Sequence, residues 1–519
     1  MTTGSLAQRL SEQIERFLAD APHAVVVEDG HALFDFSSAH YSLAPDNDKC
    51  VLQIWSEERN IVRRVVSAES RAGVLKLAVM RFGQAKPSKL EFCADADRRT
   101  PSAKKAARAT YLRLLTRMID RDFSGWRLEK LTSAPALEHS FGPTVVRGLV
   151  RHGNSAFAIV GVNAQESQAN VDGALSTGIL WMDDCRERLA GKLHVEGLRM
   201  FLPAGRSAAV RMRMAHLNRS AAKWQLFELD EAVERIEEID TSDTGNIATR
   251  LVHAPDLNAA RSRFAASIEQ IQQICPRVEV VIASAAEISF RLHGLEFARA
   301  RVEPMPGSFR MGEQIFFGPG AAEIPLSDET MPIFRELWQR LWHERALRNR
   351  TETLYRIQPE RWLESMVMRD VNALDERLDS HRVYSQVPAF SGGDRAMIDV
   401  LTVTREGRLA VIELKADEDL HLPLQGLDYW ARVRWHHERG EFQKFGYFAG
   451  RELSSERPLL IMAAPSLHVH PTTDTLLRYL SPEIEWKLLG LDEHWRDGVR
   501  VIFRKHSREH GNAAEAGKP

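Results

Sequence analysis

Hydrophobic and polar positions follow a regular order of helical and strand periods from Pro359 onward. A helical pattern over 360–378 comes first, and strand patterns follow it at 382–390, 395–403 and 408–414. The later patterns, alternately helical and strand-like, lie at 422–438, 457–465, 473–480 and 483–491. The resulting order αβββαβαβ predicts a mixed α/β core.

The same order of patterns occurs in the first half of the chain. Its helical and strand-like segments lie at 104–120, 126–132, 144–150, 156–162, 178–189, 195–203, 208–218 and 223–229. The segment FAIVGVNAQES from Phe157 aligns with LAVIELKADED from Leu409 at an offset of 252 residues. A helical pattern and a strand-rich stretch precede each copy, with the helices near 5–18 and 257–273. These matches predict an internal duplication, although α/β proteins can share such an order by chance.

The expected architecture is therefore an α/β (α+β) protein with a C-terminal αβββαβ core and a degenerate copy of the same fold before it. Each copy is expected to follow a β-rich lead segment. The predicted parts are a β-rich segment (1–100), an α/β domain (101–248), a helix with a β-rich segment (249–350), a second α/β domain (351–506) and a disordered tail (507–519).

The composition and the absence of several motifs exclude some kinds of partner and site, but they do not indicate an activity. The 519 residues are 44% hydrophobic and 27% charged with a net charge of -2, so a surface for nucleic acid would have to be a local patch. We expect a cytoplasmic protein with no membrane partner, because neither a signal peptide nor a long apolar span is present. The four cysteines form no CxxC pair, which predicts buried free thiols. The motifs GxxxxGK[ST], GxGxxG and HExxH are absent, so nucleotide and zinc-protease sites are not indicated.

Candidate chemistry lies on two neighbouring strands. In RLAVIELK, alternation places Glu413 and Lys415 on one face and Leu414 on the other. The preceding strand carries Asp399 within an apolar run, where an unpaired carboxylate is costly to bury. A bound cation would remove that cost. Oxygen donors from Asp399, Glu413 and the Leu414 carbonyl suit Mg²⁺ or Mn²⁺, and Lys415 could orient a water molecule or stabilise charge on a phosphate. Phosphodiester hydrolysis is the predicted reaction.

A further acid precedes these strands. Glu364 lies in line with Val367, Val371, Leu374 and Leu378 at helical spacing, so it borders the face toward the sheet and could reach the metal. The alternative is an ordinary glutamate in the first turn, favoured by the helix dipole.

Together, Glu364, Asp399 and Glu413-Leu414-Lys415 resemble the signature of the PD-(D/E)XK nuclease superfamily, with Ile398 where the motif has proline. Downstream, Gln425 and Tyr429 are similar to the QxxxY motif of the RecB-like branch. The resemblance covers about a quarter of the chain. It implies a restriction-endonuclease-like fold and a Mg²⁺- or Mn²⁺-dependent nuclease acting on DNA, with RNA as the alternative. It also implies that Gln425 helps order the active site and that Tyr429 acts near the substrate strand. A nucleic-acid-binding or scaffold protein that retains the fold without catalysis is the competing interpretation.

Other polar segments have two interpretations each. Arg432, Arg434 and Arg439, with His436 and His437, could contact phosphates or form a solvated helix face. Arg211 and Arg213 could form a second phosphate-facing row, although an amphipathic helix surface is favoured. His468 and His470 are interpreted as loop residues.

The first copy lacks the acids of the second. The alignment puts Ala109, Gly161 and Asn163 at the positions of Glu364, Glu413 and Lys415, and Arg147 near that of Asp399. The first half would then bind no catalytic metal. It could clamp substrate, cover the active site or pair with the second half like a dimer partner, and Arg147 could face a phosphate. A homodimer of the whole chain is the alternative to this pairing of the two halves.

Overall fold

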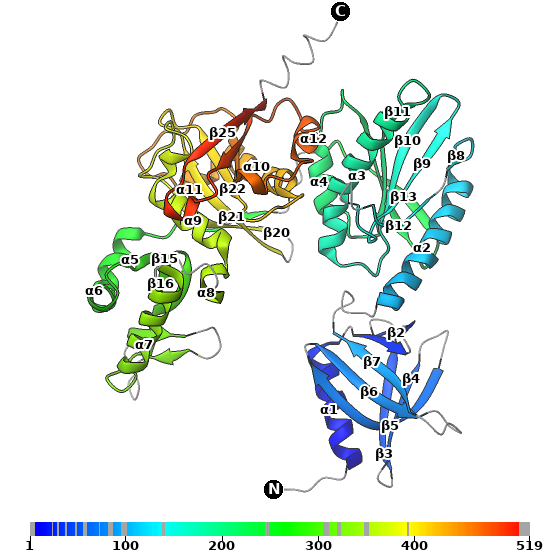
Figure 1. Cartoon of the computed structure of the whole chain (residues 1–519), viewed down its shortest axis with the longest axis horizontal. Coiled ribbons are helices and arrows are strands. Elements are labelled where there is room, and N and C mark those ends of the chain that lie inside the picture. Colours follow the sequence, from blue (N-terminus) through cyan, green and yellow to red (C-terminus); the bar gives the residue numbers. More distant parts are fainter. Residues whose placement is uncertain are drawn as a thin grey trace, which may run out of the picture. The chain divides into compact units, whose positions relative to one another are not determined.

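The computed structural model describes residues 6–22, 24–28, 31–36, 39–46, 49–55, 60–71, 73–80, 87–94, 101–129, 131–136, 141–243, 247, 249–304, 311–318, 323–346, 352–391 and 394–507. The chain divides into two compact units, drawn in Figure 1. The first comprises 1–211 with 220–241, and the second comprises 212–219 with 242–519. The main division falls after Thr241, and the short segment 212–219 joins the second unit.

The first unit begins with a helix on an antiparallel sheet, as predicted for the β-rich lead segment. Helix α1 (Leu6–Asp20) packs on a seven-stranded sheet of order β2-β1-β7-β6-β5-β4-β3. Its buried residues Ile14 and Leu18 meet Leu52, Ile54 and Phe92 of the sheet. The strands are β1 (Val25–Glu28), β2 (His31–Asp35), β3 (His40–Asp46), β4 (Lys49–Trp55), β5 (Asn60–Arg71), β6 (Val74–Met80) and β7 (Ser88–Cys93).

A mixed sheet forms the rest of the first unit. Its order is β13-β12-β11-β10-β9-β8, with β10, β11 and β12 parallel and the other neighbours antiparallel. The elements are α2 (Pro101–Asp122), β8 (Arg127–Leu128), β9 (Val146–His152), β10 (Ser155–Gly161), α3 (Gln168–Arg188), β11 (His194–Pro203), α4 (Ala208–Ala215), β12 (Lys223–Asp230) and β13 (Arg235–Ile239).

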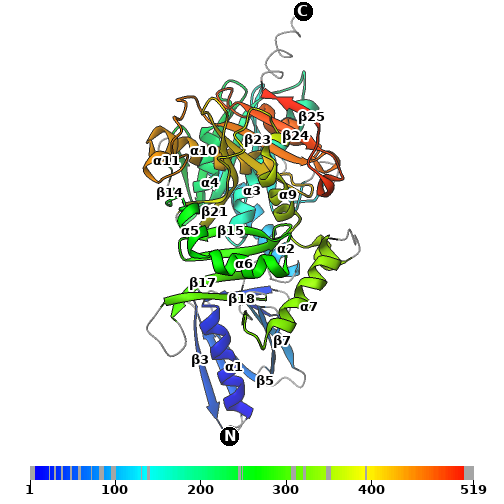
Figure 2. The ribbon, with the colours of Figure 1, turned by 90° about the vertical axis from the view of Figure 1, so that its left-hand side faces the viewer.

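The second unit also starts with helices and an antiparallel sheet. The strands β15 (Glu279–Ser284), β16 (Glu287–Leu292), β17 (Leu295–Pro304), β18 (Met311–Phe317) and β19 (Ile324–Pro325) pair in sequence order. Helix α6 lies against this sheet (Figure 2), and Phe264, Ile271 and Phe334 belong to its core. The helices are α5 (Leu257–Arg263), α6 (Ala265–Ile274) and α7 (Met331–Leu341), and a π-helical turn (Trp342–Ala346) follows.

A seven-stranded mixed sheet carries the predicted C-terminal core. Its order is β14-β20-β21-β22-β23-β24-β25, with β22, β23 and β24 parallel. The elements are β14 (Arg250–Leu251), α8 (Thr353–Arg356), α9 (Pro359–Arg369), β20 (Tyr384–Ser391), β21 (Asp394–Val403), β22 (Leu409–Leu414), α10 (Leu422–Glu438), α11 (Glu441–Lys444), β23 (Leu459–Pro465), α12 (Thr473–Arg478), β24 (Trp486–Leu491) and β25 (Val501–His506). The predicted order is confirmed, and β25 is an additional antiparallel edge strand.

The two mixed sheets share their connectivity. In each sheet, the second strand of an antiparallel hairpin is also the first of three adjacent parallel strands. A last strand pairs antiparallel with the third of these and forms the edge of the sheet. A long helix connects the first two parallel strands in both sheets, α3 in one and α10 in the other. A duplication requires such a common order, and the duplication itself stays a prediction.

Helices α9 and α10 cover opposite faces of the C-terminal sheet. On one face, Leu363 and Val367 of α9 share a core with Ile412 and Leu414 of β22. On the other, Gly426 of α10 packs against the side chains of Leu460 and Met462. Since side chains alternate along a strand, Glu413 faces the α10 side.

Four predicted boundaries are wrong. The helix predicted over 360–378 ends at Arg369, because Asp370 leaves the helical region at φ -147° and the Asn372 amide donates to the Leu378 carbonyl at 2.7 Å. Val371 and Leu378 are nevertheless buried, so the apolar spacing predicted correctly that they are buried but wrongly that they lie in a helix. The helix predicted over 257–273 breaks at Phe264. The strand predicted at 126–132 has only two residues, and the helix predicted at 178–189 already begins at Gln168, capped by Ser167.

All four cysteines are buried and none forms a disulfide, as predicted. The predicted disordered tail (507–519) lies outside the described residues, apart from Ser507.

Candidate functional site

Two strand residues bring their carboxylates together in the second unit. Val400 of β21 pairs with Ile412 of β22, which places Asp399 and Glu413 at the next opposed positions. The backbone N–H of Leu414 donates to Asp399 Oδ2 at 3.1 Å. This bond fixes the Asp399 side chain against the end of β22, beside the peptide whose carbonyl was predicted as a ligand.

Glu413 is the most deeply buried acid of the site. It is 1% exposed, and its Oε1 lies 3.3 Å from Lys415 Nζ. Its Oε2 has no hydrogen-bond partner within the described residues. Buried polar atoms are rarely left without a partner, so this oxygen is a candidate donor to a ligand. The predicted placement of Glu413 and Lys415 on one side is confirmed.

The ammonium of Lys415 is surrounded by carboxylates. Besides Glu413, it lies 3.6 Å from Glu360 Oε1 and 3.8 Å from Asp419 Oδ2. Burial opposes the charge, but the carboxylates, with Glu413 first, raise the pKa of Lys415 overall. Lys415 is therefore held as a cation beside the two strand acids.

Glu364 projects from α9 and is 5% exposed. Both of its recorded hydrogen bonds fall on Oε2, from Arg361 Nη1 at 3.0 Å and from Gln386 Nε2 at 2.8 Å. Burial raises the pKa of Glu364 to about 7; Arg361 opposes this shift and Asp399 adds to it. The helix acid is thus close enough to Asp399 to feel its charge.

The strand acids are perturbed in the same direction. Burial raises the pKa of Asp399, which the Leu414 N–H and Lys415 partly offset. Burial and then the charge of Asp399 raise the pKa of Glu413 well above its ordinary value. A cation bound here would lower the pKa of both carboxyl groups, since it stabilises their ionised forms.

The donor set fits a hard divalent cation only with help from the main chain and solvent. In the described part of the chain, no three His, Cys, Asp or Glu side chains converge closely enough to hold a metal. Asp399 and the unpartnered Oε2 of Glu413 supply two side-chain donors, and the Leu414 carbonyl could supply another. Magnesium sites commonly use one or two carboxylates and complete the shell with water and phosphate oxygens. Direct ligation by Glu364 stays a prediction.

Gln425 and Tyr429 lie four residues apart on α10. The Gln425 Oε1 atom is buried without a partner among the described groups. Burial, followed by the charges of Glu413 and Asp399, raises the pKa of Tyr429, so its phenol lies near both acids. The four-residue spacing places the two side chains on one face of α10, as predicted.

Three contributing residues were missed by sequence reasoning. Glu360 lies one turn before Glu364 on α9, a spacing that could have indicated it. Arg361 could have been suspected as its neighbour. Gln386 carries no local signal, because only the folded sheet brings it to Glu364.

The basic residues of α10 are largely engaged within the protein. Arg432 is buried, Arg434 bonds Glu438 at 2.6 Å, and the Arg439 guanidinium lies over the Trp435 ring. His436 is buried between Glu441 and Thr249. Phosphate contacts by Arg432, Arg434 and Arg439 remain a prediction.

Three other predicted residues have partners from distant parts of the sequence. Arg213 makes two hydrogen bonds to Asp428 of α10, with side-chain exposures of 9% and 13%. His468, in the turn after β23, lies 3.8 Å from Glu493, and His470 Nε2 lies 3.8 Å from Glu418. The contact of Arg213 with Asp428 is a structural ion pair, which the sequence alone did not indicate.

The corresponding strand of the first unit has no room for an acid. A Cβ atom at Gly161 would lie 2.7 Å from Tyr111 Oη and 2.8 Å from Leu115 Cδ2. Tyr111, 1% exposed, fills the space that a side chain at this position would need. The predicted loss of the acid at this strand position therefore agrees with the local packing.

Two further positions of the first unit are committed to structure. The Arg147 guanidinium donates to the carbonyls of Gly142 and Ala134 and lies 4.6 Å from the Phe141 ring centre. It does not present its donors to a phosphate. Asn163 is buried and bonds Glu166, which Arg108 neutralises at 2.9 Å.

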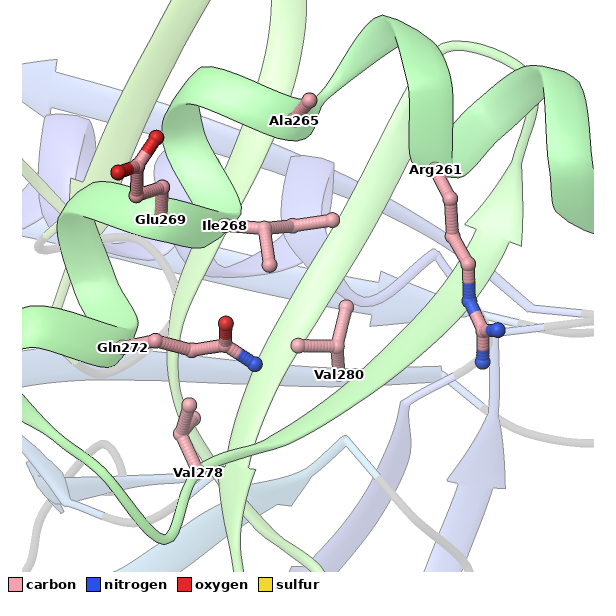
Figure 3. A pocket seen from close by; sticks show the side chains of 7 residues that line it. All are labelled: Arg261, Ala265, Ile268, Glu269, Gln272, Val278 and Val280. Atoms are coloured by element: carbon pink, nitrogen blue, oxygen red, sulfur yellow. The ribbon is translucent and has the colours of Figure 1, made fainter.

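A separate hollow of about 510 Å³ lies between α5, α6 and β15 of the second unit. Figure 3 shows Ile268 and Gln272 reaching from α6 over Val278 and Val280, with Arg261 at the border. None of its lining residues belongs to the acidic site.

Comparisons with known proteins leave the family open. No family model matches the sequence, and no curated protein matches it. One solved structure, the crystal structure of a repair endonuclease from Pyrococcus abyssi, is similar over 38% of this chain and 87% of its own, at 12% identity and a TM-score of 0.14. A similarity of this size carries no functional argument. Within the described residues, no helix is long and apolar enough to cross a membrane.

Proposed function

We propose that the second unit is a Mg²⁺- or Mn²⁺-dependent nuclease that hydrolyses phosphodiester bonds of DNA, with RNA as the alternative substrate. The observation that carries the proposal is the buried, unpartnered Oε2 of Glu413 beside Asp399, with the Lys415 ammonium 3.3 Å from Oε1. The oxygens of a buried carboxylate with a purely structural role are usually hydrogen-bonded.

Asp399, Glu413 and the Leu414 carbonyl would hold the cation. When bound, the cation lowers the pKa of a water molecule and neutralises charge on the scissile phosphate. The Leu414 N–H keeps Asp399 in place. Lys415 would orient the attacking water or stabilise charge on the phosphate, since Glu413, Glu360 and Asp419 keep it protonated. Glu364 would complete the acidic set from α9.

Helix α10 would line the substrate path. Gln425, with its unpartnered buried Oε1, would help order the site, and Tyr429 would lie near the substrate strand. Arg434 and Arg439 would contact phosphates only after leaving Glu438 and the Trp435 ring, and Arg432 only after leaving its buried position. The first unit would act as a clamp, a cover or a dimer-like partner, because its Gly161 position accommodates no acid.

A cleavage assay tests the proposal. The full chain is incubated with single-stranded, double-stranded and branched DNA and with RNA, in Mg²⁺ or Mn²⁺. We expect cleavage that Asp399→Ala and Lys415→Ala each reduce at least about 100-fold, as is usual for groups that stabilise the transition state. Asp474→Ala serves as control, because Asp474 forms a surface ion pair with Lys505. Equal cleavage by all variants would exclude this site. Binding without cleavage would favour the alternative of a nucleic-acid-binding or scaffold protein.

A further inference from the structure

Gln386 has a backbone conformation that is unusual for a strand residue. Its φ is +51°, in the left-handed region where side chains other than glycine are disfavoured. The register of β20 with β21 is unbroken on either side, from Ser385 opposite Val400 to Val387 opposite Ile398. The distortion therefore falls at the position opposite Asp399, where the ladder skips a pair.

The side chain of Gln386 makes a specific contact from this position. Its Nε2 donates to Glu364 Oε2 at 2.8 Å, and Arg361 Nη1 donates to the same oxygen at 3.0 Å. Glu364 is 5% exposed, so this is a buried acid with two donors on one oxygen. Its second oxygen has no recorded hydrogen bond in the described part of the protein. Left-handed residues cluster where the surrounding structure uses the strain for function.

We propose that Gln386 is a positioning residue of the acidic site, whose left-handed backbone aims its amide at Glu364 and sets the helix acid relative to Asp399 and the bound cation. The inference rests on the proposed nuclease function. It adds to the motif a residue from the first strand of the sheet. Replacing a residue that hydrogen-bonds to a metal ligand and orients it commonly lowers metal affinity about 10- to 100-fold.

Substitution by glycine separates the contact from the strain. Gln386→Gly removes the amide but suits the left-handed backbone, so the relief of backbone strain offsets part of the stability lost with the hydrogen bond. Gln358→Gly is the matched control. Gln358 has the same side chain and a φ of +49°, but it forms no side-chain cap bond to α9 and no recorded bond to Glu364.

Titration of the full-length protein with Mn²⁺ in a calorimeter, without nucleic acid, gives the main readout. We expect Gln386→Gly to weaken Mn²⁺ binding about 10-fold or more and to raise the Mn²⁺ concentration needed for half-maximal cleavage. Gln358→Gly should change neither. If Gln386→Gly fails to fold, Gln386→Asn takes its place, because asparagine tolerates the left-handed region and is too short to keep the bond unchanged.

Three results would overturn the inference, and they differ in what else they exclude. Wild-type Mn²⁺ affinity in the Gln386 variants, with wild-type cleavage intact, removes the positioning role and leaves the nuclease proposal standing. A flat Mn²⁺ titration and no cleavage by the wild type itself remove both. Equal weakening by Gln386→Gly and Gln358→Gly would assign the effect to the backbone of α9 and also reject the role of Gln386.

Discussion

Lys415 Nζ lies 3.3 Å from one oxygen of Glu413, whereas the other oxygen of that carboxylate has no partner within the described residues. The pair is thus half satisfied in a site where Glu413 is 1% exposed. Such an arrangement costs stability and is maintained where a ligand completes it.

Replacing the buried acid should therefore stabilise the metal-free protein. Glu413→Gln keeps the volume and removes a carboxylate whose ionised form burial disfavours, while Lys415 keeps Glu360 and Asp419 as partners. We expect an increase of about 1 to 3 kcal/mol in the free energy of unfolding and loss of cleavage. Urea denaturation in EDTA measures the first and a cleavage assay the second. Glu456→Gln, at an exposed position beside Arg408, should change neither. A less stable Glu413→Gln protein would show that the carboxylate is structural.

The stability of the metal-free protein should fall as pH rises. The pKa of Glu364 is about 7 in the folded protein against an ordinary 4.5, mainly because of burial. Between these pH values the folded state binds more protons than the unfolded state, so stability decreases from about pH 4.5 to about pH 7. The shift corresponds to about 3 kcal/mol, and Asp399 and Glu413 add to it in the same direction.

Urea denaturation in EDTA across this pH range measures the effect. Glu364→Gln should have a shallower dependence, because it lacks one of the shifted groups. Mn²⁺ should stabilise the wild type more at pH 8 than at pH 5, since the cation binds the ionised acids. Identical pH profiles for the wild type and Glu364→Gln would contradict the assigned burial effect.

Glu360 should act against polyanion binding when no metal is present. Its carboxylate is half exposed and lies 3.6 Å from Lys415 Nζ. Glu360→Gln removes one negative charge near this lysine, so metal-free affinity for a DNA duplex should rise about 2- to 5-fold at low salt. Fluorescence anisotropy at two salt concentrations measures it. The control is Glu438→Gln, on an exposed acid that pairs with Arg434 on α10. The same increase in both variants would mean that only net charge matters.

An acid should not be restorable in the first unit. The Cβ of any residue at position 161 would meet Tyr111 and Leu115 at less than 3 Å. We expect Gly161→Ala to lower the free energy of unfolding by about 1 to 3 kcal/mol and Gly161→Glu by more. Gly142→Ala is the control, since its new methyl would meet only Thr144 at 3.9 Å. A stable Gly161→Glu protein would show that Tyr111 moves aside and that this position is open to an acid.

The strands and the main acidic pair could be predicted because their signals are local. The run LAVIEL is buried at every position, which its apolar residues predict. Glu413 and Lys415 are two residues apart, so the alternation of a strand places both on the same face. Asp399 could be placed beside them because the short REG turn makes an antiparallel hairpin whose register follows from its length. The same reasoning failed for 370–378, where buried apolar residues recur at helical spacing in a short 3₁₀ helix (Val371–Ala373) and the irregular segment after it.

By itself, the sequence determined the order of strands and helices in both halves and the strand acids of the second, because alternation and apolar runs act between near neighbours along the chain. Only the tertiary structure decided which distant groups meet them. Gln386 reaches Glu364 through a left-handed residue in another strand, and Arg147 turns its donors to backbone carbonyls. Such contacts depend on packing between elements, where backbone strain and burial are set by the whole fold.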